Sequence, residues 1–359
     1  MVQLVKFISS LLWFKSYLTD RRQCVNLSGT VSNTEVLSSG IPQGSILGPA
    51  LFLLFINDLP LSWESRNGLF ADDATFYASA TTLTDVQLQL QRDLNSTAMW
   101  TKEHGMVAHP EKTKYMIIGT RQKLSRCEEC ALTLFLDDRK LEQAQEERLL
   151  GLDIDPTLSW STHVTNLRKK LLKRVAVLAR IKKFLPIKYR IILFNASIKP
   201  ILEYCASVWA SCNAGLLDDI FKVQKRCARL SLDAPFQART LPLFYKLGWL
   251  PINHICIERR LILFKKILDG RAPNYLSEKL LSLKYCKFYD TRSRMPYRLP
   301  IPRTNCRKRM FFYNALQLWN NISDNEFVYS TDLKKFRSNY FDCIMRMFTP
   351  DSFKTDKIF

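Results

Sequence analysis

Residues 38–60, SSGIPQGSILGPALFLLFINDLP, and residues 69–77, LFADDATFY, decide the fold of this 359-residue chain. In the first stretch, glycines and a proline precede a strongly apolar run, which predicts a loop and then a helix from Pro49 to Asp58 with proline in its first turn. In the second stretch, two adjacent aspartates, Asp72 and Asp73, lie between short β-like runs. This pattern predicts a tight β-hairpin with both carboxylates at its tip.

Adjacent carboxylates on a rigid hairpin suit hard divalent cations, because Mg²⁺ takes one or two carboxylates together with oxygens of a substrate phosphate. Two such ions drive in-line phosphoryl displacement. An aspartate pair alone is more typical of a plain turn than of a metal site, and the chain has two more aspartate pairs, Asp137-Asp138 and Asp218-Asp219. The upstream loop favours the metal interpretation, since Gly40 and Gly44 let the backbone approach a ligand closely and Gln43 offers an amide beside it.

The periodicity of apolar residues predicts a mixed first part and a helical remainder. Up to about residue 155 β-like runs alternate with helical ones, and beyond that point helical spacing dominates. The predicted strands are Gln23–Leu27, Thr34–Ser38, Gly68–Ala71, Ala74–Ala78, Tyr115–Gly119 and Leu132–Leu136. The further predicted helices are 2–18, Asp85–Trp100, Tyr189–Ala210, Leu216–Ser231, His254–Asp269 and two amphipathic C-terminal helices. An α+β layer followed by helices is the expected architecture.

The composition indicates an intracellular protein that meets polyanions. The 53 Lys and Arg against 33 Asp and Glu give a net charge of +20, which attracts nucleic acid, with a membrane surface as the competing partner. No stretch reaches the ~18 uncharged apolar residues of a membrane span, and no signal peptide is expected. The ten cysteines are expected to be reduced, which places the chain in the cytoplasm or the nucleus.

The segment from Asn166 to Arg190 carries ten Lys or Arg residues and no acid. Leu167, Leu171 and Val175 recur at helical spacing, so one face of the predicted helix packs and the other is cationic. Like charges without acids repel one another unless a polyanion or solvent takes them up. Both interpretations, a nucleic-acid surface and a merely solvated face, stay open at this point.

Two further features have weaker meanings. The stretch from Lys284 to Arg309 interleaves nine Lys or Arg residues with aromatic rings, which suits stacking of single-stranded RNA or an ordinary linker. Cys127 and Cys130 form a CxxC, but a structural zinc site needs four ligands and no second pair occurs at the usual spacing. No zinc site is therefore expected.

The stretch GIPQGSILGPALFLLFINDL followed by LFADD is very similar to the template-grip and catalytic motifs of reverse transcriptases from non-LTR, LINE-type retrotransposons. The segments 13–25, 109–119 and 149–164 resemble the same family, and the later helices, around KPILEYCASVWA, QKRCARL, LFKKILDGRAPNYL and LWNNI, resemble jockey-like elements. The resemblance covers nearly the whole chain and is strongest between residues 10 and 165.

The resemblance implies an α+β fold with three parts. Residues 1–157 would be a partial palm domain, an antiparallel sheet with helices. Residues 158–235 would be a helical basic thumb, and residues 236–359 a helical C-terminal region with the basic-aromatic segment.

The resemblance also implies a site for RNA-directed DNA polymerisation. Asp72 would be the metal-binding carboxylate and Asp73 its neighbour, with Mg²⁺ or Mn²⁺ as cofactor, and Lys112 would help protonate the departing pyrophosphate unless it is a solvated turn lysine. His109 stands where the family usually has Asn, and Gly151 would belong to the strand pair that grips the primer. The residues implied to bind the nucleotide and template are Gly40, Pro42, Gln43, Gly44 and Ser45.

The thumb would contact the primer-template duplex, so the implied partners are an RNA template, a DNA primer and deoxynucleoside triphosphates. The implied nucleic-acid-binding residues are Arg168, Lys169, Lys170, Lys173, Arg174, Lys182 and Lys183.

The family's site needs one more aspartate, from a strand that precedes residues 13–18, and only Asp20 and Glu35 are acidic before Asp58. The sequence-based expectation is a truncated copy that is inactive, because the first palm aspartate is absent and the catalytic set is incomplete. The alternatives are a non-catalytic RNA- or DNA-binding protein derived from a retrotransposon and a chain without a selected function.

Overall fold

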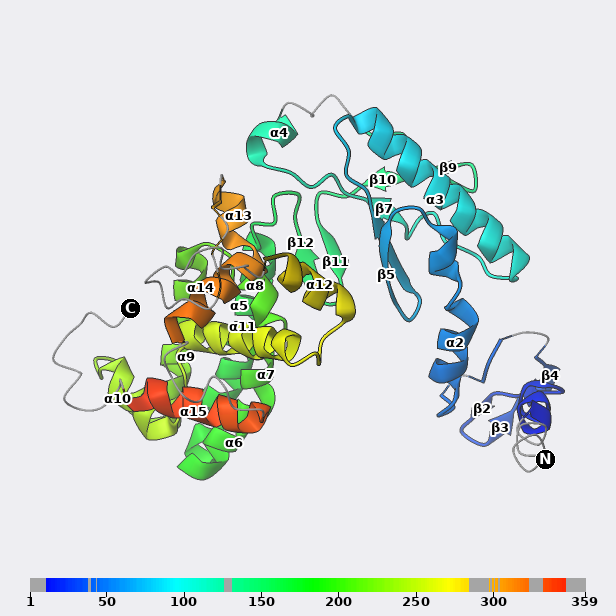
Figure 1. The fold of residues 1–359 in the computed structure, drawn as a ribbon. Helices are drawn as coiled ribbons and strands as arrows, with labels where there is room; N and C mark the ends of the chain where they lie inside the picture. The colour runs from blue at the N-terminus through cyan, green and yellow to red at the C-terminus, as the bar shows by residue number, and fades with distance from the viewer. Residues whose placement is uncertain are drawn as a thin grey trace, which may run out of the picture. The chain divides into compact units, whose positions relative to one another are not determined.

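The computed structural model describes residues 11–37, 40–42, 44–125, 131–283, 297, 299, 301–302, 304–322 and 332–346, and its helices and strands are labelled in Figure 1. The chain divides into two compact units. Unit 1 comprises Met1–Tyr115 and Cys127–Gln143, and unit 2 comprises Met116–Arg126 and Ala144–Phe359.

Unit 1 begins with a helical segment at residues 11–18 and two small antiparallel ladders. Strand β1 (Arg22–Gln23) pairs with β4 (Glu35–Val36), and between them β2 (Asn26–Leu27) pairs with β3 (Thr30–Val31). The predicted strand from Gln23 to Leu27 is therefore interrupted. At the interruption the N–H of Val25 donates to the hydroxyl of Ser32 rather than to a neighbouring strand.

The centre of unit 1 is built by α2 (Gly48–Ile56), the 3₁₀ turn η1 (Leu59–Ser62), the hairpin of β5 (Arg66–Phe70) and β6 (Asp73–Tyr77), and α3 (Leu83–Glu103). These elements share a small apolar core of Ile56, Leu59, Trp63 and Trp100. Partly buried residues from α2 and both hairpin strands pack against that core. The hairpin and both flanking helices thus form one packed body.

A second group of short strands runs along α3. Strand β7 (Lys114–Tyr115) pairs in parallel with β10 (Glu142–Gln143), and β8 (Phe135–Leu136) pairs with β9 (Arg139–Lys140). The side chain of Gln91 accepts from the N–H of Phe135 at 2.9 Å and donates to its carbonyl at 2.9 Å, and Gln87 accepts from the N–H of Thr133. Glutamines of α3 thus satisfy backbone groups that a neighbouring strand would otherwise pair.

The mixed α and β composition predicted from the sequence is confirmed, but the strands form six separate two-stranded sheets in the described part of the chain. The expected single antiparallel sheet is therefore not what these residues form, and one of the six pairings is parallel. Most strands are only two residues long, and the glutamines of α3 occupy the edge at which the 133–135 strand would extend a larger sheet.

Unit 2 opens with the hairpin of β11 (Glu147–Leu149) and β12 (Leu152–Ile154), and continues with helices. The first of these are α5 (Ser161–Ile181), the 3₁₀ turn η2 (Lys182–Phe184), α6 (Ile187–Ser197), α7 (Lys199–Glu203), α8 (Ala206–Trp209) and α9 (Ala214–Leu232). The predicted helix Tyr189–Ala210 is wrong as one element. Pro200 has no N–H for a continuous ladder, and Cys205 adopts a left-handed φ of 47°, so three helices replace it.

The later elements of unit 2 are α10 (Thr240–Leu247), α11 (Ile252–Leu268), α12 (Asn274–Leu283), α13 (Asn305–Arg309), α14 (Phe311–Ile322) and α15 (Leu333–Arg346). The short α4 (Arg121–Ser125) also belongs to unit 2. Helix α11 lies among the others, with Leu261 and Phe264 fully buried. One apolar core extends from Leu152 to Met345. The predicted division of the chain into three parts, with boundaries at residues 157 and 235, stays a prediction.

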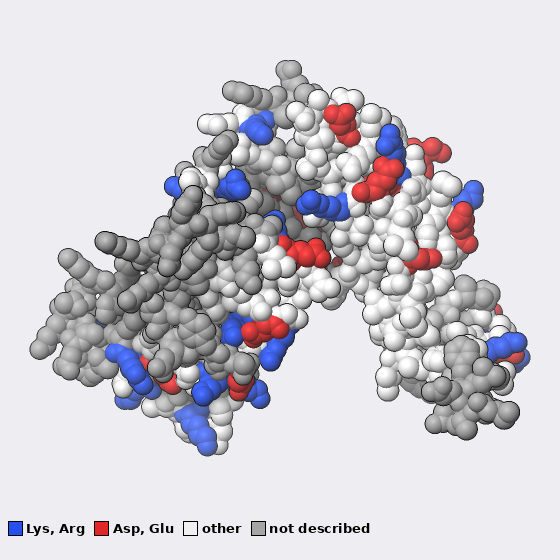
Figure 2. All heavy atoms as spheres, in the orientation of Figure 1, with Lys and Arg blue, Asp and Glu red and all other residues white. Residues whose placement is uncertain are grey.

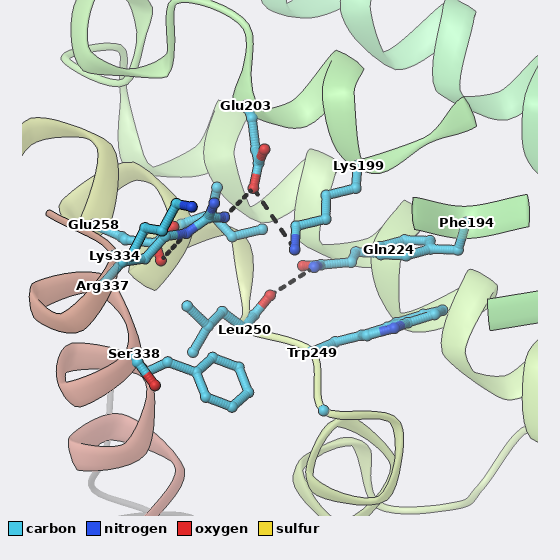
Figure 3. Close-up of a pocket in the computed structure, with 13 residues that line it drawn as sticks. Phe194, Lys199, Glu203, Gln224, Trp249, Leu250, Glu258, Lys334, Arg337 and Ser338 are labelled. Carbon is cyan, nitrogen blue, oxygen red and sulfur yellow. Dashed lines mark hydrogen bonds and ion pairs between the residues drawn. The ribbon is translucent and has the colours of Figure 1, made fainter. Parts of the chain in front are cut away.

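A pocket of about 380 Å³ in unit 2 is lined by residues of α6, α7, α9, α11 and α15 (Figure 3). Arg337 links two carboxylates of the pocket, since it donates to Glu258 at 3.0 Å and to Glu203 at 3.3 Å. The rings of Phe194 and Trp249 stack with centroids 3.5 Å apart. These contacts fasten α15 to α7 and α11, so the pocket is a structural junction.

Some predicted features lie outside the described residues. These are Cys127, Cys130 and most of the basic-aromatic stretch from Lys284 to Arg309. Tyr297 of that stretch is described, and it packs edge-on against Phe264 while its backbone exchanges two hydrogen bonds with Asn320. In the described ranges, no helix has the length and apolar character that crossing a membrane requires.

Candidate nucleic-acid site

The aspartate pair lies at the turn of the β5–β6 hairpin, as the sequence predicts. Phe70 pairs with Asp73, so Ala71 and Asp72 form a two-residue turn, and Ala71 adopts a left-handed φ of 53°. Both carboxylates are exposed. Asp137 and Asp138 form the corresponding turn between β8 and β9, whereas Asp218-Asp219 lies inside α9, so only the first two acidic pairs share a hairpin geometry.

The β5–β6 hairpin is fixed to α3 through the residues just before it. The carboxylate of Asp93, 1% exposed, accepts from the N–H of Glu64 at 2.8 Å and from the N–H of Ser65 at 3.3 Å. The indole of Trp63 donates to the hydroxyl of Thr97 at 2.8 Å. Sequence analysis missed Asp93, because an aspartate on a helix face gives no sign of the distant backbone groups it will accept from.

The donor set at the hairpin tip fits a divalent cation. Asp72 and Asp73 are both exposed, and within the described ranges neither forms an ion pair that would compete for its oxygens. Two carboxylates together with phosphate oxygens meet the usual requirement of Mg²⁺. In the same part of the chain, no three His, Cys, Asp or Glu side chains gather where they would hold a metal without a substrate.

Two glycines of the upstream loop adopt backbone conformations with positive φ. Gly40 has φ 87° and Gly44 has φ 80°, and in both cases the position a side chain would take is open space. The hydroxyl of Ser45 accepts from the N–H of Gly48 at 2.9 Å and its N–H donates to the carbonyl of Pro42, which shapes the start of α2. Gln43 lies outside the described residues, so its position beside Asp72 stays a prediction.

Lys112 is exposed and lies in a turn after α3. Its N–H donates to the carbonyl of His109, which also accepts from the N–H and the hydroxyl of Thr113. The residue that departs from the family's usual Asn thus contributes its backbone to the turn. No hydrogen bond or ion pair in the described residues joins Lys112 to the aspartates, and its catalytic role stays a prediction.

One carboxylate, that of Asp155, organises the short connection between the β11–β12 hairpin and α5. Asp155 accepts from the backbone of Thr157, Ser159 and Trp160 at 2.9 to 3.1 Å and from two hydroxyls. Burial raises the pKa of this carboxyl, but these hydrogen bonds together outweigh it and hold the pKa below its usual range. The turn at Leu150 and Gly151 has positive φ at both residues. Asp155 therefore fixes how the hairpin meets the helix.

Five of the six exposed cations of α5 lie close together in sequence, and the sixth, Arg180, lies near the end of the helix. Leu167, Leu171, Val175 and Leu178 are buried, as the periodicity predicts. The cationic face of α5 is defined by residues that are all exposed, and none is within ion-pair distance of a described acid: Arg168, Lys169, Lys170, Lys173 and Arg174.

Comparison with known proteins identifies the first part of the chain. Residues 3–154 match the family model described as reverse transcriptase (RNA-dependent DNA polymerase). The chain carries a reverse transcriptase domain. It is related to the domains of jockey-like non-LTR retrotransposons. No solved structure matches the chain.

The curated relatives are much longer than this chain. The "Probable RNA-directed DNA polymerase from transposon BS" of Drosophila melanogaster is 26% identical over 236 residues, which is 63% of this chain and 26% of that protein. The "RNA-directed DNA polymerase from mobile element jockey" of the same species is 24% identical over 237 residues, 63% of this chain and 25% of that protein. The chain thus spans about a quarter of the length of these relatives.

The reverse transcriptase match ends in β12, so it includes the acidic hairpin, the glycine loop and Lys112, and α5 follows it.

Two cations of the predicted thumb lie beyond the exposed face of α5. Lys182 pairs with Asp233 at 2.9 Å, and the buried Arg190 pairs with the same carboxylate at 2.6 Å and donates to three carbonyls. The hydrogen bonds from Arg190 and Lys182 hold the pKa of Asp233 below its usual range. The prediction that all ten cations of residues 166–190 lack an acidic partner is therefore wrong for Lys182 and Arg190. The binding role of Lys182 stays a prediction.

Proposed function

We propose that this chain is the palm and thumb part of an RNA-directed DNA polymerase from a non-LTR retrotransposon. The observation that carries the proposal is the position of Asp72 and Asp73 at the turn of a hairpin that a buried carboxylate anchors, inside the segment that matches reverse transcriptases. The names of the relatives, which describe RNA-directed DNA polymerases, support the same activity.

In this proposal Asp72 and Asp73 bind the divalent ion, Mg²⁺ or Mn²⁺. When bound, such an ion supplies charge stabilisation for in-line transfer of a nucleotidyl group to the primer's 3′-hydroxyl. The chain's own part is to hold the two carboxylates at a rigid tip and to offer backbone N–H groups from the loop of Gly40 and Gly44. Lys112 gives a proton to the pyrophosphate oxygen that leaves, a role that suits an exposed ammonium.

The cationic face of α5 binds the sugar-phosphate backbone of the template and primer. Five exposed cations on two adjacent turns of one helix can contact several phosphates, and each contact releases a condensed counterion. Asp155 sets the direction of α5 relative to the β11–β12 hairpin, which would hold the primer end. The substrates are then an RNA template, a DNA primer and deoxynucleoside triphosphates.

Primer extension by the full chain on an RNA template with Mg²⁺ or Mn²⁺ tests the proposal. We expect at most weak incorporation, because only Asp20 and Glu35 are acidic before Asp58 and the predicted catalytic set is incomplete. Asp72→Asn should abolish that incorporation and Asp137→Asn should leave it unchanged, because the second substitution removes a carboxylate from a comparable hairpin turn outside the site. Incorporation that survives Asp72→Asn would refute the assignment of this carboxylate.

A second candidate function is non-catalytic binding of RNA or DNA, and the cationic face of α5 is the observation that favours it. Five phosphate contacts predict that log K falls against log salt with a slope of about −3.5 to −4.5. Binding of that salt dependence without incorporation would favour this function over polymerisation. Absence of binding in ~50 mM salt would exclude both.

A further inference from the structure

Two phenylalanines of unit 2 stand almost fully in solvent. Phe184, the last residue of η2, is 83% exposed, and Phe236, in the loop after α9, is 82% exposed. Burying such a side chain stabilises a fold, and this fold lacks that stabilisation at both positions. Single exposed apolar residues are common, but a group of them in one place marks an interaction site.

The two rings belong to segments that one carboxylate holds together. Asp233 ends α9 and binds both Lys182 of η2 and Arg190 of α6. Phe184 follows Lys182 by two residues and Phe236 follows Asp233 by three, so each ring is attached within about 11 Å of chain from this ion pair. Tyr189, 53% exposed, precedes Arg190 directly.

An arginine side chain contacts the segment that carries each phenylalanine. The guanidinium of Arg229 lies 5.4 Å from the centre of the Phe236 ring and donates to the carbonyl of Ala238, which holds the loop against α9. On the other side, Arg190 donates to the carbonyl of Leu185, the residue after Phe184. The aromatic rings are therefore presented by fixed supports.

The segments that carry the two rings, residues 180–190 and 229–239, are positively charged, which favours an anionic partner. Residues 180–190 and 229–239 contain seven Lys or Arg residues and one acid, Asp233, whose carboxylate is already bound to two cations. Figure 2 shows that basic side chains outnumber acidic ones over the end of unit 2 where α6 lies. Exposed Lys183, Lys188 and Arg239 accompany the rings.

We propose that Phe184, Tyr189 and Phe236, with Lys183, Lys188 and Arg239, form a surface that binds single-stranded nucleic acid by stacking on unpaired bases. Flat aromatic rings beside cations match the alternation of base and phosphate along a single strand. In a duplex the base faces are covered by their neighbours, so only unpaired bases offer a face to these rings. The surface is separate from the cationic face of α5, and it does not depend on Asp72 or Asp73.

Binding of a labelled oligouridylate of about 12 nucleotides to the full chain, followed by fluorescence anisotropy, tests this surface. A blunt RNA–DNA duplex of the same length is the second probe. We expect Phe184→Ala with Phe236→Ala to weaken oligouridylate binding by about 30-fold or more, since two stacking contacts are lost and each contributes about 1–3 kcal/mol. Duplex binding should change less than about twofold, because phosphate contacts carry it.

Matched variants separate stacking from general damage. Tyr275→Ala removes another exposed ring, 67% exposed on α12, and should leave both affinities unchanged. Phe184→Trp with Phe236→Trp should restore oligouridylate binding, because any aromatic face stacks. Circular dichroism should be the same for all variants, since the substituted rings lie on the surface.

Three results would overturn the proposal. One is unchanged oligouridylate binding in the double alanine variant, and another is an equal loss on oligouridylate and duplex. The third is binding to phosphatidylserine-containing vesicles, or self-association, that requires the two phenylalanines while oligouridylate binding does not. Loss of primer extension in Asp72→Asn is independent of each of these outcomes, so this surface and the proposed polymerase fail or stand separately.

Discussion

Replacing Asp93 with alanine tests whether α3 holds the acidic hairpin in place. The Asp93 carboxylate is 1% exposed and accepts from two backbone N–H groups, of Glu64 at 2.8 Å and of Ser65 at 3.3 Å. A hydrogen bond to a charged group contributes about 1.5–3 kcal/mol, and the longer bond contributes at the lower end. We therefore expect Asp93→Ala to lower the free energy of unfolding of unit 1 by about 3–4.5 kcal/mol.

Hydrogen exchange measured by mass spectrometry locates the effect. Exchange should rise first in residues 64–70, which follow the lost acceptor, and should change little in α5, which belongs to the other unit. Asp93→Asn keeps one acceptor oxygen and should lose about half as much stability. Glu103→Ala, an exposed substitution on the same helix, should change the unfolding free energy by less than about 0.5 kcal/mol.

The reasoning is refuted if Asp93→Ala leaves the exchange of residues 64–70 unchanged, or if exchange in α5 rises as much. In either case the two hydrogen bonds do not hold the hairpin.

Two further predictions concern the junction of the β11–β12 hairpin with α5. Burial lowers the pKa of His163 in the folded chain, although the Asp153 carboxylate opposes this. The histidine of the unfolded chain keeps its ordinary pKa of about 6.5, so the unfolded chain binds more protons as the pH falls below that value. The contribution of His163 to stability is complete above that pH and is lost as pH falls through the folded pKa. The free energy of urea unfolding of unit 2 should therefore decrease as the pH is lowered through this range. His163→Gln should reduce this pH dependence to the part due to His254, whose pKa burial also lowers. Gly151→Ala should cost about 1–3 kcal/mol in the same measurement, because φ is 80° and the added Cβ would lie 3.4 Å from the ring of Tyr204, and an unchanged unfolding midpoint would contradict this.

The local parts of the fold could be predicted from the sequence because their causes are local. Two aspartates between β-like runs specify the hairpin turn, and the spacing of Leu167, Leu171 and Val175 specifies the buried side of α5. Helix α2 begins one residue before Pro49, which was expected in its first turn.

The parts that sequence analysis missed depend on partners far along the chain. Lys182 and Arg190 look like free cations until Asp233, more than forty residues later, is brought against them. The predicted single helix from Tyr189 failed at Pro200, which the apolar periodicity did not take into account, and at Cys205, where a change to left-handed φ leaves no mark in that periodicity. For the same reason the aromatic surface at Phe184 and Phe236 is visible only in the structure, since each ring by itself resembles an ordinary core residue.

The apolar core of unit 2 determines which pieces of this chain can be exchanged with its relatives. Leu167 of α5, Phe264 of α11 and Phe336 of α15 belong to the same core, so a chimaera joined near residue 235 would have to match side chains from two parents across one packed interior. A junction at the start of the β11–β12 hairpin leaves that interior intact. Chimaeras that transplant residues 144–346 as one block should therefore retain cooperative unfolding where finer exchanges lose it.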